Sequence, residues 1–105
     1  MNNLYEKFTQ EDLKILNTKF NNATCRILEL SHVIHKLDEV DISKILSAFD
    51  GINRAAGILN SICEQLLTDD FVTTADPMSY IHEKSDFSFK FLDDLCKKHS
   101  LAQWL

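Results

Sequence analysis

Apolar residues recur along much of the chain at alternating spacings of three and four, the pattern of one face of a helix. The first series consists of Leu13, Leu16, Phe20, Ala23, Ile27, Leu30, Ile34 and Leu37. The second series consists of Ile42, Ile45, Phe49, Ile52, Ala56, Leu59, Cys63 and Leu66. Each series fills heptad positions a and d, so we predict helices over residues 10–37 and 42–68. Their connection is short, and they must therefore fold back as an antiparallel hairpin.

Residues that cap helices stand where these predicted helices begin. Thr9 is a suitable N-cap for the first helix and Asp41 for the second. A third helix is predicted after the connection 69–75, because Asp76 is a good N-cap and Pro77 suits the first helical position.

One part of this third helix has a pattern that is also compatible with a strand. Phe87, Phe89 and Phe91 alternate with polar residues, as they would in a short strand, but a lone strand has nothing to pair with. We therefore predict a helix, either continuous or broken near Ser85 and Asp86, with Phe87 and Phe91 facing the hairpin and Phe89 near the edge. The predicted fold is an all-α antiparallel three-helix bundle with a long helical hairpin, or a four-helix bundle if the third helix is broken.

Small residues gather in the second predicted helix. Gly51 and Gly57 each cost about 1 kcal/mol relative to alanine in a helix interior. Together with Ala48, Ala55 and Ala56 they make this stretch thin, which predicts the close approach of another helix. Because the heptads keep their register across Gly51, we predict one continuous helix.

The chain has more apolar positions than the hairpin alone can bury. The second helix carries further apolar residues at positions e and g, namely Leu46, Ala48, Ala55, Ile62 and Leu67. Phe89 and the apolar C-terminal residues Leu101, Trp104 and Leu105 add to this surface, and exposed aromatic residues mark interfaces. We predict that these four residues bind a partner and that the chain forms a homodimer; the alternative is that the C-terminal tail folds back over the open end of its own bundle.

Composition places the chain among single-domain globular proteins. Its 105 residues contain only 2 Gly and 1 Pro, and they favour one helical domain over residues 1–105. A net charge of −5 argues against direct nucleic-acid binding, and no apolar stretch approaches the length of a membrane span. Three cysteines without CxxC spacing and the absence of a secretory signal predict a cytoplasmic protein without disulfides.

Residues Ser31 to Leu37 resemble the H-box of sensor histidine kinases, in which a helical hairpin presents a phosphorylatable histidine after a serine. The resemblance implies His32 as the phosphoacceptor, and its heptad position f predicts an exposed side chain. Val33 stands where the H-box has an acidic residue, and Lys36 stands where it has a proline.

Candidate metal ligands and nucleophiles are few. Glu29 and His32 have the ExxH spacing of di-iron bundles, but both point outward, which excludes a di-iron centre. Cys25 shares that outer face, so an adventitious surface zinc site is the alternative to a solvated face. Cys63 is predicted in the core, and the sequence pairs no cysteine with a convincing histidine and carboxylate. We therefore predict no enzyme activity, no cofactor and no resident metal.

These observations favour a non-catalytic helical interaction or regulatory module that binds a protein partner or itself. One alternative is a histidine phosphotransfer bundle that uses His32. Another is a small acidic inhibitor of a nucleic-acid enzyme, for which the acidic clusters at 38–41, 69–76 and 93–94 are the motivating feature.

Overall fold

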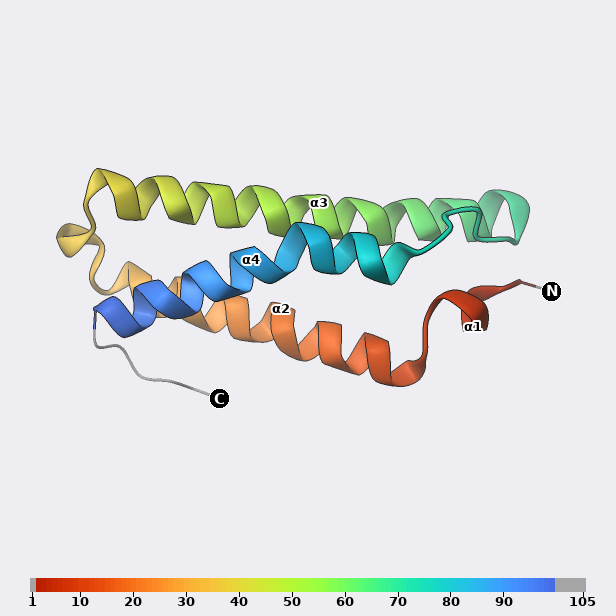
Figure 1. Cartoon of the computed structure of the whole chain (residues 1–105), viewed down its shortest axis with the longest axis horizontal. Coiled ribbons are helices and arrows are strands. Elements are labelled where there is room, and N and C mark those ends of the chain that lie inside the picture. Colours follow the sequence, from red (N-terminus) through yellow and green to blue (C-terminus); the bar gives the residue numbers. More distant parts are fainter. Residues whose placement is uncertain (1, 100–105) are drawn as a thin grey trace.

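A computed structural model describes residues 2–99 of the chain, and these residues form helices and turns without a strand. The helices are α1 (Leu4–Lys7), α2 (Gln10–Ser31), the short 3₁₀ helix η1 (Ile34–Lys36), α3 (Glu39–Asp69) and α4 (Pro77–Lys98). The three long helices run lengthwise along an elongated bundle, as Figure 1 shows. The predicted all-α bundle is confirmed, and α4 is one continuous helix across Ser85 rather than a strand or two segments.

The N-caps explain why each long helix begins where it does. Thr9 is the N-cap of α2, and its hydroxyl accepts a hydrogen bond from the Asp12 backbone N–H at 3.0 Å. Asp76 caps α4, with Pro77 in the first turn, so both of these predictions are confirmed. The predicted cap of α3 is wrong: Asp38 is the N-cap, and Asp41 lies inside the first turn as the other member of a capping box.

The first long helix is shorter than predicted. It ends at Ser31, and the chain then passes through a turn and η1 before α3 begins. Val33 and Leu37 nevertheless pack against the core, in non-helical backbone. Apolar residues recur in this segment because the connection itself is partly buried, and not because the helix continues. The prediction of a helix to residue 37 is therefore wrong.

The fourth helix lies between the two arms of the hairpin. Close backbone contacts join α4 to α3 and, to a smaller extent, α4 to α2, whereas α2 and α3 approach each other little. In Figure 1, α4 runs in the same direction as α2 and opposite to α3. The predicted hairpin is therefore present, but α4 fills the space between its arms.

The buried face of α3 is rotated from the predicted one. Positions g and c are innermost, and the buried residues of the helix are Asp41, Ala48, Gly51, Ala55 and Ile62. The predicted core positions a are exposed instead, and their residues are Ile42, Phe49, Ala56 and Cys63. The predicted burial of Cys63 is thus wrong, because α4 covers the neighbouring stripe of small residues.

The closest approach of two helices occurs at Gly51. A Cβ atom there would overlap the Ser88 hydroxyl and the Lys84 carbonyl oxygen of α4. Ser85 and Ser88 are fully buried at this crossing, and the Ser85 hydroxyl donates a hydrogen bond to the Ile81 carbonyl at 2.6 Å. Small residues on both helices therefore permit the contact, as predicted for Gly51. Gly57 is different, since nothing lies within 4 Å of a Cβ placed on it.

Two of the three phenylalanines of α4, Phe87 and Phe89, take positions other than the predicted ones. Phe87 was expected to face the hairpin but is 44% exposed. Phe89 is half-buried against the core, and its ring meets that of Phe20 on α2 edge to face with centroids 5.6 Å apart. The helical twist brings Ser85, Ser88 and Leu92 to the α3 side, which leaves Phe87 at the rim.

Candidate functional site

A continuous stripe on α3 faces away from the protein's own core. Its residues alternate at spacings of four and three over positions a and e, and all are exposed: Ile42, Leu46, Phe49, Asn53, Ala56, Asn60, Cys63 and Leu67. Leu46 and Leu67 have exposed fractions of 63% and 89%. From first to last residue the stripe is about 38 Å long at the helical rise of 1.5 Å. We call it the α3 stripe; six of its eight residues are apolar, and exposed apolar surface of this kind marks interaction sites.

The polar members of the α3 stripe have regular positions. If Leu46 is assigned to heptad position a of a new seam, Asn53 and Asn60 are the next two a positions, and Ile42 and Phe49 are d positions. Asparagine at such positions in two-stranded coiled coils fixes register and oligomeric state at a cost in stability. The α3 stripe therefore has the pattern of a coiled-coil seam.

Apolar surface continues from α3 onto α2 where the connection turns. A cavity of about 160 Å³ opens there, lined by Ile27, Leu30, Ser31, Ile34, Leu37 and Ile45. Ile34 is 65% exposed at its edge. This end of the bundle thus adds an apolar hollow beside the α3 stripe.

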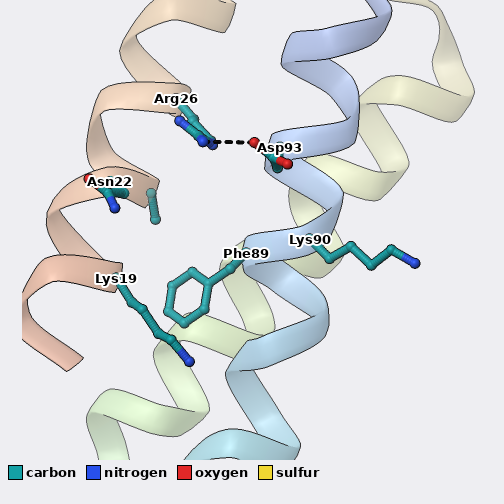
Figure 2. A pocket seen from close by; sticks show the side chains of 7 residues that line it. Lys19, Asn22, Arg26, Phe89, Lys90 and Asp93 are labelled. Carbon is teal, nitrogen blue, oxygen red and sulfur yellow. Dashed lines mark ion pairs between the residues drawn. The ribbon is translucent and has the colours of Figure 1, made fainter. Parts of the chain in front are cut away.

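A second, charged cavity lies between α2 and α4, and Figure 2 shows its walls. Its volume is about 350 Å³, and its lining residues are Lys19, Asn22, Ala23, Arg26, Phe89, Lys90 and Asp93. Arg26 Nη2 contacts Asp93 Oδ1 at 2.7 Å across the cavity's upper end in that view. Partial burial acts to raise the pKa of Asp93, but the hydrogen bond from Lys97 and the positive charge of Arg26 outweigh it and lower the pKa.

Arg26 is a buried charge that the sequence pattern does not predict. It is only 5% exposed, although its heptad position g beside the predicted core would allow a solvated side chain. Cys96 is buried close by, with its sulfur 3.8 Å from the Arg26 carbonyl oxygen, and burial raises the pKa of this thiol. A raised pKa disfavours the thiolate, so Cys96 is a packing residue here.

A buried carboxylate joins the start of α3 to the end of α4. The Asp41 side chain is 2% exposed and accepts a hydrogen bond from Lys98 Nζ at 2.7 Å. His99 Nε2 lies 3.1 Å from its other oxygen. The Lys98 hydrogen bond lowers the pKa of Asp41, burial opposes this, and His99 adds to the lowering. Asp41 thus links the two helix ends, in addition to its place in the capping box.

This cluster predicts that acid destabilises the fold. The pKa of Asp41 lies below its ordinary value of 3.8 in the folded chain, so its contribution to stability is complete above that value. The contribution is lost as the pH falls from 3.8 through the lowered pKa. We expect the urea midpoint, measured by circular dichroism, to fall as the pH is lowered from about 4 to about 2.

Replacing Lys98 by methionine tests the cause of this loss. Without the Lys98 ammonium group, the pKa of Asp41 should return toward its ordinary value, so Lys98→Met should be less stable at neutral pH and lose less on acidification. Lys14→Met is the control, because Lys14 is exposed on α2 and forms no ion pair within the described residues. Equal acid sensitivity of Lys98→Met and the parent would contradict the role assigned to Asp41.

The predicted site residues do not form one site. His32 is exposed, as predicted, but it is the C-cap of α2, and Ser31 to Leu37 form a turn and η1 rather than one helix face. Phe89 is half-buried between α2 and α4, while Leu101, Trp104 and Leu105 lie outside the described residues. The roles of His32 as phosphoacceptor and of Phe89 in partner binding stay predictions.

Two other features of the described part bear on function. Within residues 2–99, no group of three or more histidine, cysteine, aspartate or glutamate side chains is placed to hold a metal ion. Among the same residues, every helix is too short or too polar to cross a bilayer.

Comparison with known proteins gives no relative: the chain matches no protein-family model, no curated protein and no solved structure.

Proposed function

We propose that this chain is a non-catalytic interaction module whose partner is a second copy of itself, bound through the α3 stripe. The observation that carries this proposal is the unbroken heptad spacing of the stripe on a helix face that the protein's own core does not use. An amphipathic helix needs only one apolar face to join its own bundle, and a second one needs another partner.

A two-fold dimer suits the sequence of the α3 stripe. In a two-fold interface the same patch is used by both copies, which requires a self-complementary surface. A parallel, in-register pair would place Asn53 and Asn60 each beside its own counterpart, where the two amides can hydrogen-bond to each other. An antiparallel pair with the same seam would place Asn60 against Phe49, so parallel pairing is favoured.

The proposed setting is the cytoplasm. All three cysteines are free, and Cys25 and Cys63 are exposed, which suits a reducing compartment. In such a compartment the dimer is held by packing rather than by a disulfide.

The first test is the effect of a charge in the α3 stripe on oligomeric state. We expect the parent to sediment at roughly twice the chain mass of 12.1 kDa at micromolar concentration and Leu46→Lys to sediment as a monomer, because a lysine at the seam would have to be desolvated in the dimer. Leu28→Lys is the matched control, since Leu28 on α2 is 59% exposed, close to the 63% of Leu46. It should remain a dimer.

Cross-linking then tests the orientation. In the parallel dimer the two copies of Cys63 face each other, whereas Cys25 lies on a different helix. Mild oxidation should link the parent through Cys63 and leave Cys63→Ser uncross-linked, with Cys25→Ser behaving as the parent. A parent that is monomeric at every loading would reject the proposal. A dimer that survives Leu46→Lys but is lost on deletion of residues 101–105 would place the contact on the C-terminal residues instead.

A further inference from the structure

The cavity between α2 and α4 has cationic walls in a chain whose net charge is −5. Lys19, Arg26 and Lys90 line it together with the carboxylate of Asp93, and Lys19 also pairs with Asp86 at 3.4 Å. Figure 2 shows the Lys90 side chain extending away from α2, so Arg26 and Lys19 are the cations closest to the space between the helices. The cavity therefore favours a negatively charged guest.

Arg26 has unused hydrogen-bonding capacity at this site. The Arg26 residue is only 5% exposed, and its Nη2 atom forms an ion pair with Asp93. Its other terminal nitrogen, Nη1, is buried and has no hydrogen-bond partner within residues 2–99. A buried charged donor without an acceptor is unfavourable, and a guanidinium group matches a carboxylate in geometry and charge. Because Nη1 has almost no accessible surface, a carboxylate in the cavity would reach this donor only after the side chains that cover it move aside.

Apolar groups form the rest of the cavity wall. The Phe89 ring extends from α4 toward α2 below the Arg26–Asp93 pair in Figure 2, and Ala23 lines the α2 side. The Phe89 ring is held in place by its edge-to-face contact with Phe20. A guest that reached Arg26 with its charged end would therefore meet apolar surface with its remainder.

We propose that this cavity binds a small organic monoanion, with its carboxylate at Arg26 and Lys19 and its apolar body against Phe89 and Ala23. The cavity volume of about 350 Å³ is at the lower end of the range for small-molecule sites. A single charge fits better than two, because the Asp93 carboxylate borders the same space and repels a dianion. This site is separate from the α3 stripe and does not depend on dimer formation.

Titration with phenylacetate tests the proposal, with its neutral amide phenylacetamide and inorganic phosphate as comparison probes. Phenylacetate should shift the backbone amide resonances of residues 19–26 and 89–93 in a saturable way, and phenylacetamide should bind at least tenfold more weakly. Equal binding of the acid and the amide would reject the role of the charge. Phosphate binding as tight as that of phenylacetate would reject the role of the apolar wall.

Variants locate the binding site. Arg26→Gln should weaken phenylacetate binding at least tenfold, whereas Lys97→Gln should change it less than twofold, although both remove a partner of Asp93. Asn22→Phe fills the cavity from the α2 side and leaves the Arg26–Asp93 pair in place, so it keeps the proposal testable if Arg26→Gln does not fold. Undiminished binding by a folded Arg26→Gln or Asn22→Phe chain would overturn the proposal.

Discussion

Leu30→Ala is expected to lower the free energy of unfolding by about 2 to 5 kcal/mol, as for other truncations of fully buried leucines. Leu30 is 2% exposed and belongs to the core cluster with Ala23, Leu92 and Leu95, so the missing methyl groups would leave a cavity between α2 and α4. Domains of this size have a total stability of about 5 to 15 kcal/mol, so this loss is a large share of it. Urea denaturation followed by circular dichroism measures the change.

Leu28→Ala is the matched control for this substitution. Leu28 lies on the same helix, two residues earlier, but is 59% exposed, so the change should stay within about 0.5 kcal/mol. The loss of unfolding free energy for Leu59→Ala should lie between those of Leu28→Ala and Leu30→Ala, because Leu59 is half-buried against the other core cluster. Equal losses for Leu28→Ala and Leu30→Ala would contradict the core face assigned to α2.

The helices themselves could be predicted from the sequence because their signals are local. Apolar spacing and N-cap residues act over a few positions, and they located α2 from Thr9 and α4 from Asp76. The end of α2 could not be located in this way. Ile34 and Leu37 both satisfy the helical spacing, yet Ile34 is 65% exposed and Leu37 packs on the core from non-helical backbone, and only the tertiary contacts show this.

The buried face of α3 could not be predicted from spacing alone. This helix carries apolar residues at positions a, d, e and g, so several faces satisfy the helical period equally well. Its inner face is decided by where α4 can approach closely, and that is the side of Ala48, Gly51 and Ala55. The small residues indicate this face in the sequence, but the large apolar residues at positions a and d indicate a different one.

The charged features of the candidate sites depend on partners far away in the sequence. Arg26 is buried because Asp93 on α4 meets it, and Asp41 is buried because Lys98 and His99 reach it from the other end of the chain. When the partner of a charged residue is not known, the residue is expected to be exposed to solvent. Neither burial could therefore be inferred without the packing of α4 against both other helices.

Gly51→Ala is expected to destabilise the chain by about 1 to 3 kcal/mol, the usual cost of overpacking a tight contact. The new methyl group would overlap the Ser88 hydroxyl and the backbone carbonyl of Lys84. The serine side chain can rotate, but the carbonyl belongs to α4 itself, so the two helices would have to move apart. This loss should outweigh the gain of about 1 kcal/mol in helix propensity that alanine brings.

Gly57→Ala, on the same helix, is expected to stabilise the chain and not to destabilise it. A Cβ at this position has no neighbour within 4 Å, so only the helix propensity changes, and we expect a gain of up to about 1 kcal/mol. Urea denaturation of the two variants beside the parent therefore separates packing from propensity. If Gly51→Ala also stabilises the chain, α3 and α4 do not approach each other at this crossing, and the interior face assigned to α3 is wrong.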